Sequence, residues 1–203
     1  MPLQLRHLFK KPSKDIIVVS GLPRSGTSMM MKMLASAGLE ILTDNLRNAD
    51  ANNPKGYYEF ERVKQLKAGD FDWLSGAQGK VVKIISALLE YLPNQYQYKV
   101  IFMRRDMVEI LASQRQMLIR DGKPDDHVSD AKMAELYENH LKRVETWLAQ
   151  QPNVNTLYFS YNQALRNPEP DLTRINQFLG GQLDIKLMLQ VVDPNLYRER
   201  RSG

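Results

Sequence analysis

The residues best suited to chemistry in this chain form a glycine-bracketed loop after an apolar segment. The apolar segment is Asp15–Ser20, and the loop reads Gly-Leu-Pro-Arg-Ser-Gly-Thr-Ser over Gly21–Ser28. A phosphate-binding loop of the Walker A type has two glycines separated by four residues, then a lysine and a serine or threonine. Gly21 and Gly26 keep this spacing, but Thr27 stands where the lysine would be. The spacing predicts an anion site that lacks the usual lysine.

The absence of that lysine does not prevent the loop from binding an anion. Backbone N–H groups and the positive end of the following helix attract an anion without any side chain. Arg24 supplies a cation inside the loop, and its charge-assisted hydrogen bonds are worth about 1.5–3 kcal/mol each. We expect Ser25, Gly26, Thr27 and Ser28 to complete the contacts with the anion. The alternative, a plain strand-to-helix turn, does not explain why glycines, hydroxyls and a cation occur together.

A second group of polar residues follows a later apolar segment. Tyr98–Arg104 is predicted as a strand, and Arg105 and Asp106 come directly after it. Ser113 lies eight residues beyond Arg105. If a helix begins near Asp106, Ser113 lies about two turns along it, so Arg105 and Ser113 can converge on a second anion. The alternative is that Arg104 and Arg105 cap the sheet edge and that Ser113 is a small packing residue.

These residues are carried by alternating strands and helices, which is typical of an α/β fold with a mostly parallel sheet. The predicted strands are Asp15–Ser20, Val81–Ile84, Tyr98–Arg104 and Asn155–Ser160, and the predicted helices are Thr27–Gly38, Tyr57–Lys67, Asp106–Ile119, Ser129–Gln150, Tyr161–Leu165 and Glu169–Leu179. A chain of 203 residues is expected to form one domain. We therefore predict an N-terminal extension over 1–14 and a single domain over 15–203.

Composition narrows the classes of function. Hydrophobic residues make up 43% and charged residues 25% of the chain, which is ordinary for a globular protein. No segment approaches the roughly 20 apolar residues that span a bilayer. The chain has no cysteine, which excludes a disulfide framework and favours a cytoplasmic location. The net charge of +5 suits an anionic ligand, but the basic residues are spread along the chain, which disfavours nucleic-acid binding.

Taken together, the two polar segments resemble the family of sulfotransferases that use 3′-phosphoadenosine-5′-phosphosulfate (PAPS). Pro23–Ser28 is similar to the family's 5′-phosphosulfate loop, and Arg105 followed by Ser113 is similar to its 3′-phosphate motif. The resemblance spans about Asp15–Gly180. It implies a P-loop NTPase-like, three-layer fold with a central, mostly parallel sheet. It also implies transfer of a sulfonyl group from PAPS to a hydroxyl or amine, with no metal.

The resemblance also implies roles for individual residues. Arg24 matches the basic loop residue that contacts the phosphosulfate, and Thr27 and Ser28 match the hydroxyl positions on the 5′-phosphate. Lys83 matches a lysine that stabilises the sulfonyl group during transfer. Tyr161 matches a tyrosine that lies near the adenine. These positions, with Arg105 and Ser113 on the 3′-phosphate, make up the implied site.

The histidine that removes the acceptor proton in many members has no counterpart here. Lys83 is followed by Ile84 and Ile85 where those members have threonine and histidine. A carboxylate base, as in the tyrosylprotein and heparan branches, is the remaining option. Glu59 and Glu61 follow a predicted turn, and Glu59 is favoured because it lies nearer that turn.

Some alternatives stay open at this point. Arg198 lies in a basic C-terminal segment that either covers the nucleotide, as the resemblance implies, or is a solvated end. A P-loop kinase or NTPase is disfavoured, because Thr27 replaces the lysine and no Walker B acid follows an apolar strand. A catalytically inactive nucleotide-binding protein is suggested by the missing histidine. The acceptor and the oligomeric state are not determined by the sequence.

Overall fold

The computed structural model describes residues 14–44, 58–122 and 128–192. At its centre lies a parallel four-stranded sheet, with the strands in the order β2-β1-β3-β4. The strands are β1 (Ile16–Gly21), β2 (Val81–Lys83), β3 (Tyr98–Arg104) and β4 (Val154–Ser160). Because all four strands run the same way, their carboxyl ends meet at one edge, where open α/β sheets bind their ligands.

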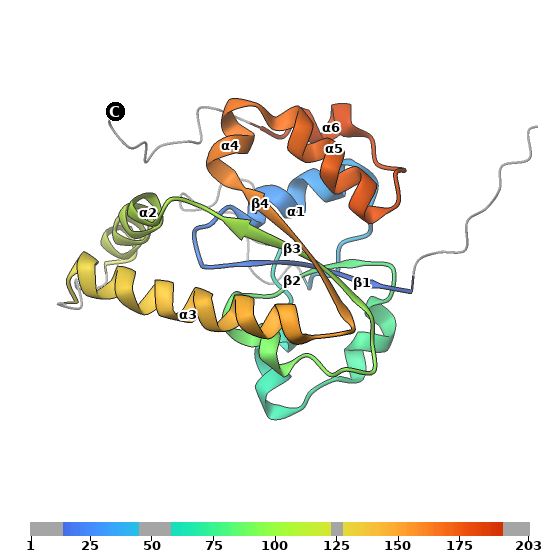
Figure 1. Cartoon of the computed structure of the whole chain (residues 1–203), viewed down its shortest axis with the longest axis horizontal. Coiled ribbons are helices and arrows are strands. Elements are labelled where there is room, and N and C mark those ends of the chain that lie inside the picture. The colour runs from blue at the N-terminus through green and yellow to red at the C-terminus, as the bar shows by residue number, and fades with distance from the viewer. Residues whose placement is uncertain (1–13, 45–57, 123–127, 193–203) are drawn as a thin grey trace, which may run out of the picture.

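Helices cover both faces of the sheet and give the fold three layers (Figure 1). The first face is covered by α1 (Thr27–Ser36), α4 (Tyr161–Arg166), α5 (Pro168–Leu179) and α6 (Ile185–Leu189). The second face is covered by α3 (Asp130–Gln150) and by the 3-10 helices η1 (Glu61–Ala68), η2 (Asp72–Ala77) and η3 (Ser86–Tyr91). The remaining helix, α2 (Met107–Arg120), follows β3 and contacts α3.

The two faces have separate cores, because successive side chains of a strand point to opposite sides. Ile16 and Val18 of β1 pack among residues of the α3 layer, whereas Ile17 and Val19 pack among residues of the α1 layer. All six residues of β1 are buried, which accounts for its continuous apolar sequence. The loop after β1 is therefore fixed to a central strand that is held on both faces.

The structure confirms the predicted parallel α/β fold. The four strands begin and end within one residue of their predicted limits. Asp106 and Ser129 cap α2 and α3 with their side chains, at the positions where these helices were predicted to begin. Helix α1 ends at Ser36, two residues before its predicted limit.

One predicted helix is wrong in its start and its type. The sequence predicted a helix over Tyr57–Lys67, but the structure has a 3-10 helix that begins at Glu61, after an extended Phe60. Tyr58 has a φ of 53°, which an α-helix does not accommodate. The short helices η2, η3 and α6 were not predicted, because five or six residues are too few to show a hydrophobic period.

Within the three described ranges, no helix has both the length and the apolar sequence needed to cross a membrane.

Candidate functional site

The loop after β1 contains two glycines at which a side chain would be strained and would meet neighbouring atoms. Gly26 has a φ of 99°, and a Cβ atom at this position would lie 2.4 Å from the ring of Tyr161. Gly21 has a φ of 148°, and its Cβ would lie 2.7 Å from the carbonyl oxygen of Met103 on β3. The glycine spacing in the sequence thus reflects close contacts with α4 and β3.

The first turn of α1 is suited to binding an anion. Within the described part of the chain, no side chain caps this helix end, and its first turn holds no acidic residue. The Ser25 hydroxyl is buried and has no hydrogen-bond partner among the described residues, while its backbone N–H closes the turn on the Leu22 carbonyl (3.2 Å). A buried polar group without a partner is costly, and a hydrogen bond to a ligand would remove that cost. The helix terminus adds a positive potential at the same place.

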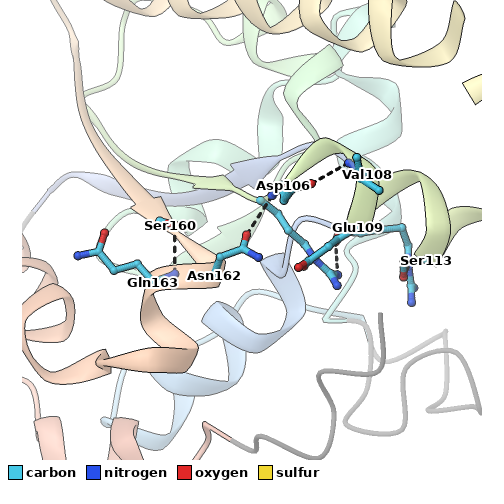
Figure 2. A network of polar contacts seen from close by, with 9 residues as sticks. Asp106, Val108, Glu109, Ser113, Ser160, Asn162 and Gln163 are labelled. Carbon is cyan, nitrogen blue, oxygen red and sulfur yellow. Dashed lines mark hydrogen bonds and ion pairs between the residues drawn. The ribbon is translucent and has the colours of Figure 1, made fainter. Parts of the chain in front are cut away.

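The second polar segment is held by contacts at the start of α2. The Asp106 carboxylate accepts a hydrogen bond from the Val108 N–H (2.9 Å), and the Asp106 N–H donates to the Asn162 side chain (2.9 Å) (Figure 2). Arg105 donates from Nε to Glu109 Oε2 at 3.0 Å, and only 8% and 3% of these side chains are exposed. Arg105 is therefore a buried cation paired with a carboxylate one helical turn further on.

The two polar segments are joined through Arg24. Its Nε donates to the hydroxyl of Ser113 at 3.0 Å, although the two residues lie 89 positions apart. Its carbonyl oxygen accepts a hydrogen bond from Arg105 at 3.0 Å, and its φ is 69°. The structure thus brings the predicted residues Arg24, Arg105 and Ser113 into one connected group.

Tyr161 lies in the same group, at the start of α4. Its ring packs against Gly26, and the guanidinium carbon of Arg105 lies 4.6 Å from the ring centre. Such a cation over an aromatic face is attracted by the ring electrons. The side chain is buried, so the ring contributes to holding the loop and Arg105 together. Its predicted place near an adenine stays a prediction.

Lys83 and Glu59 form an ion pair at the end of β2. The Nζ of Lys83 lies 3.6 Å from Oε1 of Glu59, and 9% and 25% of the two side chains are exposed. The backbone carbonyl of Glu59 accepts a hydrogen bond from the Thr43 hydroxyl at 2.8 Å. Glu61 instead pairs with Lys64 at 2.7 Å, with 42% of its side chain exposed. Of the two candidate bases, Glu59 is the one beside Lys83.

A cavity of about 230 Å³ opens beside the loop. Its lining includes Leu22 and Ser25 of the loop, Ile110 of α2 and Leu141 of α3. Arg104 lies at the same cavity and pairs with Glu145 of α3 at 2.7 Å. Arg104 is therefore directed toward α3, and Arg105 is the arginine that turns to the loop.

Some residues of the site were not identified from the sequence, and one predicted residue lies elsewhere. Glu109 was missed, although its spacing of four residues from Arg105 is the usual signal of a helical ion pair. Asn162 and Thr43 were missed because contacts between distant segments leave no local signal. Arg198 lies outside the described residues. Over the described ranges, no cluster of three or more histidines and carboxylates is placed to hold a metal ion.

Comparisons with known proteins show the family of the chain. The family model described as "Sulfotransferase domain" matches residues 14–198. A search of curated proteins found no match.

Solved sulfotransferase domains share the fold. The domain from a Synechococcus PCC 7002 olefin synthase has 18% identity and a TM-score of 0.52, covering 95% of this chain and 85% of that chain. The domain from the curacin biosynthetic pathway has 15% identity and a TM-score of 0.51, covering 88% and 78%. Retinol dehydratase, solved with androsterone and the inactive cofactor PAP, has 16% identity and a TM-score of 0.50, with 87% of this chain and 62% of that chain covered. The fold, the loop after β1 and the family match lead to one conclusion: the chain belongs to the sulfotransferase domain family.

Proposed function

We propose that this protein transfers a sulfonyl group from PAPS to a hydroxyl or amine of an acceptor. The observation that carries the proposal is the hydrogen bond from Arg24 to Ser113, because it joins the helix-end anion site to the second polar segment. A donor with phosphate groups at its 5′ and 3′ positions matches two anion sites that are built as one unit. The complex of retinol dehydratase with PAP supports the same choice of nucleotide.

The residues at the loop fit the negative charge of such a donor. The uncapped start of α1 and the buried Ser25 hydroxyl offer hydrogen bonds to a 5′-phosphosulfate, together with Thr27 and Ser28. Arg105 and Ser113 are assigned to the 3′-phosphate. Arg24 lies between the two and offsets charge on the transferred group. Binding then depends on fixed N–H and O–H donors and on arginines, which act without a metal ion.

Glu59 and Lys83 are assigned to the transfer step. The acceptor oxygen or nitrogen forms the new bond to sulfur while the bond from sulfur to the nucleotide oxygen breaks, and the acceptor proton passes to the Glu59 carboxylate. Protonation removes the negative charge that lies 3.6 Å from the Lys83 ammonium. The positive charge of Lys83 then acts on the charge that develops on the transferred group and the leaving oxygen.

The proposal is tested by comparing 3′-phosphoadenosine-5′-phosphate (PAP) with ATP and Mg²⁺ in thermal-shift titrations of the full chain. We expect PAP to raise the melting temperature at lower concentration, because only PAP carries a 3′-phosphate. Transfer of ³⁵S from labelled PAPS to a panel of alcohols, phenols, amines, glycans and peptides then identifies the acceptor. A preference for ATP with Mg²⁺ would contradict the proposal and favour a kinase or NTPase.

A further inference from the structure

The backbone leaves the sheet after Lys83 through Ile84 and Ile85, a short connection to η3 that we call the corner. The N–H of Ile84 bonds to the carbonyl of Val19 on β1 at 3.0 Å. Ile85 is 43% exposed, and Ser86 is again buried and begins η3. Within the described residues, no side chain caps η3 through its first backbone N–H groups. The direction of the corner must therefore be fixed by other contacts.

A hydrogen bond between Ser86 and His140 of α3 helps to hold this corner, together with the buried side chains of Ile84 and Leu89. The Ser86 hydroxyl oxygen and the Nε2 atom of His140 lie 2.8 Å apart. The Nδ1 atom of His140 lies 3.3 Å from the guanidinium of Arg143, which can only donate. Nδ1 is therefore the acceptor, Nε2 carries the hydrogen, and His140 donates to Ser86. Arg143 thus favours the tautomer with Nε2–H, and the Ser86 hydroxyl, which can donate or accept, takes the accepting role.

Helix α3 is a firm support for this contact. Val144 and Leu148 are buried in the core of the same layer, one and two turns beyond His140. Glu145 pairs with Arg104 at the end of β3. The corner after β2 is thus tied to β1 at Ile84 and to α3 at Ser86, with Lys83 immediately before the first tie.

We propose that His140 is a positioning residue for Lys83, acting through its hydrogen bond to Ser86. The inference rests on the proposed function, because it gives Lys83 and its partner Glu59 their roles in transfer. His140 touches neither donor nor acceptor in this proposal. It holds the corner so that the Lys83 ammonium stays beside Glu59, since small displacements of a catalytic group lower the rate steeply.

The charges around His140 indicate which protonation state the contact uses. Burial lowers the pKa of His140, and Arg143 on the same helix lowers it further, while Glu90 on η3 acts in the opposite direction. The ring is therefore neutral at neutral pH and can accept from Arg143. When the ring is protonated, both nitrogens carry hydrogens, so the contact with Arg143 is lost and the two cations repel each other.

Three substitutions at one position separate this role from simple packing. His140→Gln can extend an amide N–H to about the place of Nε2, so it keeps the donor to Ser86. His140→Asn reaches only about the place of Nδ1, so it loses that donor, and His140→Ala loses both ring nitrogens. Ser86→Ala removes the partner, and Lys142→Gln on the exposed side of α3 serves as the control.

We expect kcat to fall about tenfold in the Asn, Ala and Ser86→Ala variants, while the donor KM and the affinity for PAP stay within about twofold of the original protein. His140→Gln is expected to recover most of kcat, and Lys142→Gln to behave like the original protein. Ser86→Ala should cost little more once His140→Ala is present, because both remove the same contact. Unchanged kcat in His140→Asn, or no recovery in His140→Gln, would overturn the proposal. If His140→Ala does not fold, the comparison of kcat between His140→Asn and His140→Gln still tests the proposal.

The pH profile gives a second, independent readout. Protonated His140 keeps its Nε2–H, but repulsion from the neighbouring Arg143 should move the ring away from Ser86, so kcat of the original protein should fall as the pH drops below the ordinary histidine pKa of 6.5. His140→Gln has no group to protonate at this position, so the fall in kcat that His140 causes at acid pH should be absent from that variant. Identical acid limbs in the two proteins would count against the role of His140.

Hydrogen exchange separates a failure of this inference from a failure of the proposed function. The amides of Ile84 and Leu88 bond to Val19 and Ile85, and both should exchange faster in His140→Asn but not in His140→Gln. This readout needs neither donor nor acceptor. If the original protein transfers no sulfonyl group, the proposed function is wrong, and the exchange rates still show whether His140 holds the corner.

Discussion

At the scale of single residues, the site separates two glutamates that the sequence distinguished only by their distance from a predicted turn. Glu59 lies beside Lys83, whereas Glu61 extends into solvent with Lys64. The difference comes from the backbone, since Tyr58 has a positive φ and the Glu59 carbonyl is held by Thr43. The two side chains are therefore a matched pair for testing the base.

Glu59→Gln removes the proposed base but keeps the size and polarity of the side chain. We expect kcat to fall about 10²–10⁴-fold, which is the usual worth of a general base, while PAP still binds. Glu61→Gln is the control and should keep kcat within about twofold. Steady-state kinetics and a PAP titration of both variants check this. Equal losses in the two variants would show that neither carboxylate is the base.

At the scale of elements, α2 and the loop after β1 are interlocked through Arg105. The Arg105 side chain pairs with Glu109 on α2 and donates to the backbone of Arg24 in the loop. Substituting Arg105 therefore does more than remove one contact with a phosphate. It also removes the cation that pairs with the buried Glu109 carboxylate, and it removes the hydrogen bond to the Arg24 carbonyl that supports the loop.

Arg105→Ala is expected to lower the free energy of unfolding by about 3–5 kcal/mol, because it removes one partner of a buried ion pair. Adding Glu109→Gln should restore much of that stability, since the buried charge is gone. The double variant should still lack the preference for PAP over the nucleotide without a 3′-phosphate. Urea unfolding and nucleotide titrations measure the two effects separately. A double variant that keeps the preference would show that Arg105 does not bind the 3′-phosphate.

At the scale of the whole molecule, two separate cores support the edge of the sheet where the site lies. The α3 layer carries the end of β2 with Lys83, and the α1 layer carries the loop, with α4 packed against it. His140 is half-buried in the α3 layer, and burial lowers its pKa. Stability should therefore depend on pH through that layer.

Acid is expected to destabilise the original protein more than His140→Gln. The folded protein has the lower histidine pKa, so the unfolded chain binds more protons as the pH falls below 6.5. The contribution of neutral His140 to stability is present above pH 6.5 and is lost as the pH falls toward the lowered pKa, with a slope of at most about 1.4 kcal/mol per pH unit. Urea unfolding of both proteins at pH 7.5 and 5.5 measures the change in the free energy of unfolding. Equal losses in both proteins would place the acid sensitivity elsewhere.

Much of the fold could be predicted from the sequence, because its strongest signals are local. β1 and β3 are nearly continuous apolar runs, which is what burial on both faces requires. Asp106 and Ser129 mark helix starts through contacts with residues two or three positions away. The start of η1 could not be predicted, because the Glu61 N–H bonds to the side chain of Asp44, 17 positions earlier in the chain.

By itself, the sequence determined the loop after β1, its spacing of glycines without the Walker lysine, and the strand and helix start that place Arg105 eight positions before Ser113. These are local features, because a strand, a turn and a helix start are each encoded within a few residues. Only the tertiary structure decided that Arg24 bonds to Ser113 and that Glu59 rather than Glu61 faces Lys83. Those contacts join segments far apart in the chain, and their partners are selected by how the layers pack around the sheet.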